Sequence, residues 1–368
     1  MLRVGIIDID TTHPWALANY INATRKAQVV AVSDSGETWQ QEHAREFARR
    51  LNPPAAVYNS ANEMMGKVDA VMFCGNRYDL RIHQISPFLD AGLPIYIDNP
   101  AVGTLKDVQQ LEKYVYSGAR LLMGSSLPLC PELKEVWRRV TAGSPCGLVV
   151  VGWRSLFEYG IHATDIALNL MQSSPRRIQW GAFGPTECVW TELANGQDFL
   201  FYTGLPYCQW QVTCMTAEGL YSTMLNLDLS RGCHYDLLAQ AFVELAQTGR
   251  TLIPPHWHLE GIKLLIAAKR SREEGRTIAM DELQELDGFD GREYAEAYRA
   301  IASQANPEDY LSPNIEVLMR EKSQMKSAAS AGFFKKMPRS TITKAKKIAK
   351  HILGEKGTKL VKQVLKRA

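Results

Sequence analysis

The chain has 368 residues, of which 46% are hydrophobic and 22% are charged, a balance typical of a soluble globular protein with about two domains. No apolar run approaches the roughly 18–20 residues that a membrane-spanning helix needs, and residues 1–7 enter a strand-like run without the pattern of a signal peptide. Seven irregularly spaced cysteines without a Cys-x-x-Cys pair argue against a disulfide framework or a zinc site, so we expect reduced thiols in a cytoplasmic protein.

Strand-like and helix-like segments alternate over the first 125 residues. Strands are predicted at 4–9, 28–33, 55–58, 68–74, 94–98 and 120–124, and helices at 15–26, 39–51, 79–92 and 104–117. Such alternation predicts a doubly wound parallel sheet, and right-handed crossovers bring the carboxyl ends of its strands to one edge, where ligands bind. We therefore predict an α/β fold that begins with a Rossmann dinucleotide-binding-like domain in residues 1–125.

The pattern changes to closely spaced strands after about residue 145. Strands are predicted at 147–153, 178–183, 188–192, 199–203, 209–216 and 220–227, with helices at 162–171, 235–248 and 258–274. This predicts an α+β domain with an open, mostly antiparallel sheet in residues 126–300, which would hold the substrate and an oligomer interface. A helical extension, 301–334, and a basic amphipathic tail, 335–368, complete the predicted organisation.

The first predicted strand leads into a turn where a dinucleotide-binding chain normally has Gly-x-Gly-x-x-Gly. The three glycine positions are here Asp8, Asp10 and His13. Carboxylates beside a pyrophosphate would repel it, whereas Thr11, Thr12 and backbone N–H groups suit a phosphate at a helix start. The same residues also suit helix capping or, less readily, a metal site, and these alternatives stay open.

Asp34 ends the second predicted strand. An acid at this distance from the turn typically accepts hydrogen bonds from the adenine ribose and repels a 2′-phosphate. If a cofactor binds, Asp34 therefore favours NAD over NADP. A loop aspartate without such a role is the alternative.

Several motifs, in order, resemble the glucose-fructose oxidoreductase / inositol dehydrogenase / MocA oxidoreductase family. The family's D-A-V-x-I-A-T-P-N, H and A-G-K-H-V-x-x-E-K-P segments are similar to residues 68–76, His83 and 89–101. The segment after its sixth strand is similar to residues 124–132. Its D-x-G-x-H-x-x-D helix start resembles residues 158–165, and its last helix and Gly-Arg turn resemble residues 258–278. The likeness covers about residues 1–280.

The resemblance implies roles for individual residues. The lysine, carboxylate and histidine of the family's catalytic centre correspond by position to Asn99, Glu158 and His162. Asparagine donates a hydrogen bond but neither relays a proton nor supplies charge, so His162, helped by Glu158, is the expected acid and base. The cofactor-binding segments of the family correspond to segments that contain Asn76, Asp98 and Pro100 in this chain.

Two functions follow from the resemblance. The first is an oxidoreductase that uses NAD in preference to NADP, forms a homo-oligomer and acts on a sugar, inositol or nucleotide-sugar. The second is a non-catalytic scaffold or regulator that binds a sugar or nucleotide, which the altered glycine turn and the missing lysine favour. His256 and His258 resemble a metal pair, but a role at a helix start or in the core is the stronger reading, because no third ligand lies nearby in sequence.

The segment 335–368 carries 12 lysines and arginines and one acid, Glu355. Of the chain's 42 basic and 39 acidic residues, residues 1–334 thus hold 30 and 38, a net charge of −8 against +11 for the tail. Apolar residues at helical spacing predict an amphipathic helix there. It suits an anionic membrane at the inner face, an acidic protein partner or the chain's own acidic body, and less well nucleic acid or a solvated tail.

Overall fold

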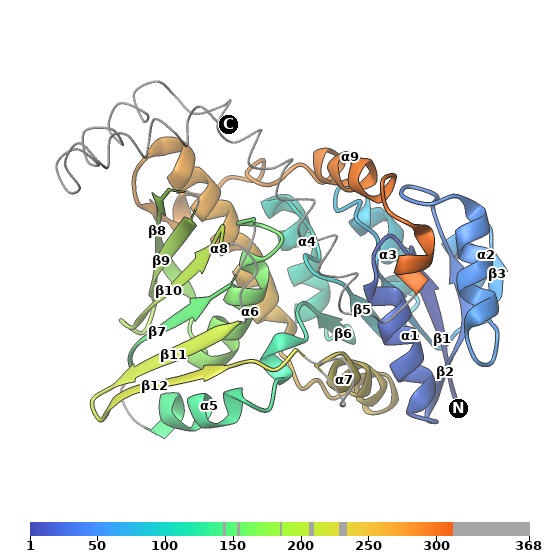
Figure 1. Ribbon diagram of the computed structural model, residues 1–368, viewed down its shortest axis with the longest axis horizontal. Helices are drawn as coiled ribbons and strands as arrows, with labels where there is room; N and C mark the ends of the chain where they lie inside the picture. Colours follow the sequence, from blue (N-terminus) through green and yellow to red (C-terminus); the bar gives the residue numbers. More distant parts are fainter. Residues whose placement is uncertain (143–144, 153–154, 185, 206–209, 228–233, 312–368) are drawn as a thin grey trace. The chain divides into compact units, whose positions relative to one another are not determined.

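The computed structural model describes residues 1–142, 145–152, 155–184, 186–205, 210–227 and 234–311, which fall within one compact unit. Two sheets organise these residues (Figure 1). The amphipathic tail predicted at 335–368 lies outside the described residues, as does the greater part of the extension predicted at 301–334. The predicted domain boundary near residue 125 falls just after the last strand of the first sheet.

The first sheet contains six parallel strands among the described residues, in the order β3-β2-β1-β4-β5-β6. Its strands are β1 (Leu2–Ile7), β2 (Ala27–Ser33), β3 (Ala56–Tyr58), β4 (Ala70–Phe73), β5 (Ile95–Ile97) and β6 (Leu121–Met123), and its helices are α1 (His13–Ala23), α2 (Gln41–Arg50), α3 (Arg81–Asp90) and α4 (Leu105–Tyr116). All residues of β4 are buried, as expected for a central strand covered on both faces. The order reverses direction between β1 and β4, which places the ligand crevice at their carboxyl ends.

The second sheet has the order β12-β11-β7-β10-β9-β8-β13. These strands are β7 (Pro145–Val151), β8 (Pro175–Phe183), β9 (Thr186–Leu193), β10 (Asp198–Thr203), β11 (Gln211–Thr216), β12 (Gly219–Met224) and β13 (Ile278–Ala279), with helices α5 (Leu133–Ala142), α6 (Gly160–Met171), α7 (His234–Thr248), α8 (Pro255–Glu274) and α9 (Gly291–Ala302). Its described pairs are antiparallel except for β7 with β10. Alternate residues of β9 are buried, because one face of the sheet is covered by α6 and α8.

The fold class predicted from the sequence is confirmed: a Rossmann-type parallel sheet is followed by a mostly antiparallel one. The predicted strands differ from the observed strands by a few residues at their ends. Helix α5 was not predicted, although its residues are amphipathic. Short 3-10 helices also occur at η1 (Ala61–Met64), η2 (Leu127–Leu129) and η3 (Met280–Glu282), and η4 (Pro307–Leu311) lies within the helical extension predicted at 301–334. None of the described helices combines the length and apolar character that crossing a membrane requires.

Helix α7 follows β12 of the second sheet in sequence but packs against α1 of the first sheet (Figure 1). Phe242 of α7 is 1% exposed, and its ring centroid lies 6.2 Å from that of Tyr96 in β5. The hydrophobic core around β1 and β2 thus includes residues from both halves of the chain. The first sheet is therefore completed by a helix encoded after β12 of the second.

Phe242→Ala tests this dependence. Removing a fully buried phenylalanine ring should lower the free energy of unfolding by about 3–5 kcal/mol, measured by urea denaturation. Tyr116→Ala, at a side chain that is 80% exposed on α4, is the control and should change stability by less than about 0.5 kcal/mol. An equal effect of the two substitutions would contradict the packing role of α7.

Candidate active site at the carboxyl edge of the first sheet

His162 lies between two loops of the first sheet. Its Nε2 is 3.2 Å from Asn99 Nδ2, in the loop after β5, and its Nδ1 is 2.6 Å from Ser125 Oγ, in the loop after β6. The ring of Trp210 meets the imidazole edge to face at 5.6 Å. The sequence placed Asn99 and His162 in one site, and the structure brings them into contact.

A buried carboxylate and a second histidine lie behind His162. Asp165, one turn further along α6, accepts a hydrogen bond from Ser125 N at 2.7 Å and lies 2.9 Å from Nδ1 of His258. His258 Nε2 in turn accepts a hydrogen bond from Ala101 N at 3.1 Å. Both side chains are at most 3% exposed. His258 is thus a buried core histidine near the start of α8, and no described group of three or more His, Cys, Asp or Glu residues is arranged to hold a metal ion.

Asp98 is a buried carboxylate directly after β5, at the same edge of the sheet. Its carboxylate accepts hydrogen bonds from Tyr96 OH at 2.8 Å and Asn99 N at 3.0 Å, and it lies 2.8 Å from Nδ1 of His13 at the start of α1. Burial alone would raise the pKa of Asp98, but His13 and these donors together hold it below its ordinary value. The next peptide bond, Asn99–Pro100, is cis. Asp98 therefore supplies a negative charge beside Asn99.

Glu158 does not contact His162 in any described hydrogen bond. Its carboxylate accepts hydrogen bonds from Tyr294 OH of α9 at 2.5 Å and from Ser155 Oγ at 3.1 Å. Burial and the charge of Glu158 raise the pKa of Tyr294, so the phenol remains a donor. The catalytic role predicted for Glu158 stays a prediction, because its carboxylate is held by α9.

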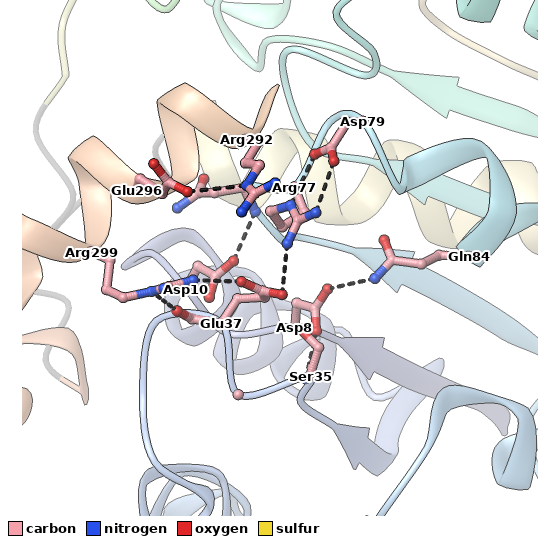
Figure 2. A network of polar contacts seen from close by, with 12 residues as sticks. Asp8, Asp10, Ser35, Glu37, Arg77, Asp79, Gln84, Arg292, Glu296 and Arg299 are labelled. Carbon is pink, nitrogen blue, oxygen red and sulfur yellow. Dashed lines mark hydrogen bonds and ion pairs between the residues drawn. The ribbon is translucent and has the colours of Figure 1, made fainter. Parts of the chain in front are cut away.

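The turn between β1 and α1 keeps the backbone of a glycine turn without its glycines. Asp8 has a φ of 62°, a left-handed conformation that aspartate tolerates better than most residues. Its carboxylate accepts hydrogen bonds from Ser35 N at 2.8 Å and Gln84 Nε2 at 3.3 Å (Figure 2). A Cβ atom at Gly75 would lie 2.5 Å from this carboxylate, so Gly75 is required for the close approach of β4 to the turn.

Three buried carboxylates meet here: Asp8, Asp10 and Asp34. Burial, then the charges of Asp8 and Asp34, raise the pKa of Asp10 to about 7, against the lowering effects of Thr38 and Asn76. Burial and Asp8 likewise raise the pKa of Asp34 to about 6. Asp10 is therefore partly protonated near neutral pH, which weakens the repulsion expected from the sequence.

Asp34 faces the turn and not the outside of the crevice. Its oxygens accept hydrogen bonds from Ile9 N at 2.9 Å and Gly36 N at 2.8 Å, and the residue is 7% exposed. The role of Asp34 in reading an adenine ribose therefore stays a prediction. The side chain of Glu37, three residues later, is 23% exposed and is thus more accessible than Asp34.

Several buried polar side-chain atoms near the turn have no hydrogen-bond partner among the described residues. Besides Asp10 Oδ1 and Trp15 Nε1, they include Thr12 Oγ1, at the residue preceding α1, and Asn76 Nδ2, in the loop after β4. Asn76 N donates to Asp10 Oδ2 at 2.7 Å, so the two loops adjoin. Thr11 Oγ1 accepts a hydrogen bond from His13 N at 3.2 Å. The side chain that accepts a hydrogen bond from the first residue of α1 is therefore that of Thr11. Thr12 Oγ1 and Asn76 Nδ2 could still bond to a ligand, as buried polar groups in binding sites do.

Residues 291–311, here called the α9 segment, pack against the loop after β2. Arg299 forms an ion pair with Glu37 at 2.5 Å, and Arg77, from the loop after β4, forms another at 2.8 Å (Figure 2). The ring of Tyr310 packs on Trp39 at 4.4 Å, and Trp39 Nε1 donates to Asp10 O at 3.1 Å. The α9 segment therefore covers the loop after β2 and ties it to the turn.

Sequence reasoning missed Ser125, Ser126, His234, Tyr294 and the pairing of Asp165 with His258. Ser126 Oγ lies 2.6 Å from His234 Nδ1 at the start of α7. The segment that contains both serines was recognised from the resemblance, but no local pattern indicates which hydroxyl meets which histidine. A weak signal was the set of histidines at helix starts, namely His13, His162, His234 and His258.

No protein-family model matches the sequence, and no curated protein matches it in sequence. Solved structures match in fold. Scyllo-inositol dehydrogenase from Lactobacillus casei, with bound NAD(H) and scyllo-inositol, is 11% identical, with a TM-score of 0.67 over 77% of this chain and 100% of the other. Myo-inositol dehydrogenase from Corynebacterium glutamicum is 15% identical, with a TM-score of 0.64 over 76% and 98%. GenD2 from gentamicin A biosynthesis, in complex with NAD, is 16% identical, with a TM-score of 0.65 over 76% and 96%. These matches confirm the fold that the sequence motifs implied.

The raised pKa of Asp10 makes stability depend on pH. The folded chain binds this proton more tightly than the unfolded chain, whose carboxyl has a pKa near 3.8, so the free energy of unfolding should fall as pH rises from about 4 to about 7. Asp10→Asn keeps an oxygen for Asn76 N and removes the titration. We expect the variant to be more stable than the parent at about pH 8, with a flatter pH profile, since each pKa unit corresponds to about 1.4 kcal/mol.

Urea denaturation between about pH 4 and pH 8 measures this difference. Asp69→Asn is a control with the opposite expected effect on the pH dependence of stability. Arg3 lowers the pKa of Asp69 by a hydrogen bond and its charge, so ionised Asp69 stabilises the fold as pH rises. Parallel pH profiles for the parent and Asp10→Asn would show that Asp10 does not titrate in this range.

Proposed function

We propose that this chain, which has the fold of glucose-fructose oxidoreductase / inositol dehydrogenase / MocA oxidoreductases, is an NAD-dependent oxidoreductase. Its substrate is a sugar, inositol or related polyol that is oxidised or reduced at a hydroxyl or carbonyl carbon. The observation that carries the proposal is His162, held by hydrogen bonds at both ring nitrogens at the strand edge where this fold binds ligands. Fold neighbours that include an inositol dehydrogenase with NAD(H) and scyllo-inositol support the substrate class.

When bound, the dinucleotide would supply or accept the hydride, and the residues of the chain would take up or release the proton. The substrate hydroxyl would replace Asn99 as the partner of His162 Nε2, which takes the hydroxyl proton on oxidation and returns it on reduction, as imidazole does near neutral pH. Asn99 donates its amide hydrogen to the oxygen that gains negative charge, in place of a lysine. An amide is a weaker donor than an ammonium group, so the proton transfer depends more on His162 than it would with lysine at position 99.

The residues present fit a dinucleotide on the α1 side of the crevice. Thr12 Oγ1 and Asn76 Nδ2 are buried and have no partner among the described residues, and the N–H groups that open α1 suit phosphate oxygens. Thr11, Thr12 and His13 would hold the phosphates, and Asn76 a ribose. Because the pKa of Asp10 is raised to about 7, its carboxyl opposes a phosphate less than an ionised group would.

The other partners remain predictions from the sequence. A homo-oligomer is expected, and the basic tail at 335–368 is expected to meet an anionic surface or an acidic partner. Both depend on residues or chains outside those described.

His162→Gln tests the assigned acid and base. Loss of general acid–base catalysis should lower turnover of inositols with NAD by at least about 100-fold, measured by absorbance of NADH. Glutamine keeps a polar side chain of similar reach, so the melting temperature should change by only a few degrees. His83→Gln, at an exposed histidine on α3, is the matched control and should retain activity. Retention of turnover by His162→Gln would rule out His162 as the acid and base.

Arg299→Ala tests whether the α9 segment restricts entry of the nucleotide. Removing the Arg299–Glu37 ion pair, whose partners are 46% and 23% exposed, frees Glu37 and loosens the cover over Trp39. Exposed pairs of this kind contribute up to about 1 kcal/mol, so the dissociation constant of NADH should fall by about two- to fivefold, measured by fluorescence titration. Arg292→Ala is the matched control, because Arg292 pairs only with Glu296 on its own helix among the described ion pairs. Weaker binding by Arg299→Ala would show instead that Arg299 holds the nucleotide.

A further inference from the structure

His162 belongs to a closed circuit of hydrogen bonds that joins the two sheets. The circuit is formed by the loop 99–101, His162, Ser125, Asp165 and His258. Starting from the loop, Asn99 contacts His162, and Ala101 contacts His258. The two histidines are then connected through Ser125 and Asp165, so the circuit returns to its starting loop.

The direction of each hydrogen bond on the His258 side is fixed by chemistry. Ala101 N–H can only donate, so His258 Nε2 accepts and the ring proton lies on Nδ1. Nδ1–H then donates to Asp165, 2.9 Å away. The other oxygen of Asp165 accepts the Ser125 N–H at 2.7 Å. The Asp165 carboxylate therefore accepts hydrogen bonds from the loop after β6 and from α8.

Asp165 fixes the backbone at Ser125, and glycine at the preceding position allows it. Gly124 has a φ of 97°, and a Cβ atom there would lie 2.5 Å from His258 Nδ1 and 2.6 Å from Asp165. Ser125 Oγ accepts the Leu127 N–H at 3.1 Å while it lies 2.6 Å from His162 Nδ1. The hydroxyl can accept a hydrogen bond from His162 Nδ1 or donate one to it, so the partner of the other ring nitrogen decides the direction.

The partner of the other ring nitrogen of His162 decides the proton position. Asn99 Nδ2 is a donor, so the Nε2 atom 3.2 Å away accepts. A neutral imidazole that accepts at Nε2 carries its hydrogen at Nδ1. The lone pair at Nε2 then lies on the side of Asn99, where the proposed reaction removes a proton.

We propose that Asp165 and His258 are positioning residues that hold Ser125 so that neutral His162 keeps its proton on Nδ1 and presents Nε2 as the base. Neither residue contacts the reacting atoms. Both act through the Ser125 hydroxyl, and their effect on turnover rests on the proposed function. Their effect on the His162 ring does not, because the tautomer is a property of the chain alone.

Nitrogen-15 NMR of the full chain with labelled histidine tests the tautomer without any substrate. We expect the parent His162 to give the Nδ1-protonated pattern. Asp165→Asn replaces an acceptor by a group that bears N–H donors, so it should disturb Ser125 and convert His162 to a mixture of tautomers. Asp90→Asn, at an exposed carboxylate of α3, and His256→Gln, on the same helix as His258, are the controls and should leave the pattern unchanged.

Ser125 provides a second pair of variants in case Asp165→Asn fails to fold. Ser125→Ala removes the acceptor of the His162 proton and should give the same mixture, whereas Ser125→Thr keeps the hydroxyl and should preserve the parent pattern. With inositol and NAD, Ser125→Ala should shift the midpoint of the pH profile of kcat/KM and lower kcat by about tenfold, while KM changes by less than about twofold.

Two results would overturn the proposal. One is an Nε2-protonated His162 in the parent chain. The other is an unchanged tautomer in Ser125→Ala or in folded Asp165→Asn, which would make the circuit a purely structural feature. A parent chain that shows the expected tautomer but turns over no polyol would overturn the proposed function and leave the positioning role intact.

Discussion

The arrangement of the site depends on the hydrogen bonds that the buried carboxylate of Asp165 accepts. A buried charge is stable only when its oxygens are well supplied with donors, and these come from the loop after β6 and from α8, which packs on the second sheet. The requirement to satisfy one charge therefore fixes the first sheet's edge against the helices of the second. The hydrogen bonds of Asp165 therefore also set the position of His162, one turn earlier on α6.

The turn after β1 has the left-handed backbone of a glycine turn, although aspartate occupies the position. Asp8 keeps a left-handed φ of 62°, and its carboxylate accepts hydrogen bonds that a glycine could not make. The consequence is electrostatic, because three buried carboxylates share the turn and the pKa of Asp10 rises to about 7. Asp8 thus connects the turn to the loop after β2 and to α3, and the three carboxylates would oppose a phosphate more strongly at high pH.

Periodicity in the sequence predicted the strands and helices because a parallel sheet needs continuous apolar runs and amphipathic helices. The resemblance also predicted Asn99 and His162 in one site, and the two side chains are in contact. The pairing of Asp165 with His258 spans 93 residues, and that of Glu158 with Tyr294 spans 136, so no local pattern could indicate them. Asp34 was placed at the correct strand end, but the direction of its side chain depends on the Ile9 N–H, which only the folded turn reveals.

Helix α9 connects the two halves of the site. Tyr294 donates a hydrogen bond to Glu158, and Arg299, five residues later on the same helix, forms an ion pair with Glu37. A change in the position of α9 would therefore alter the surroundings of both carboxylates. Each carboxylate also has a second partner outside α9, Ser155 for Glu158 and Arg77 for Glu37, so α9 shares the placement of both with the loops that they belong to or adjoin.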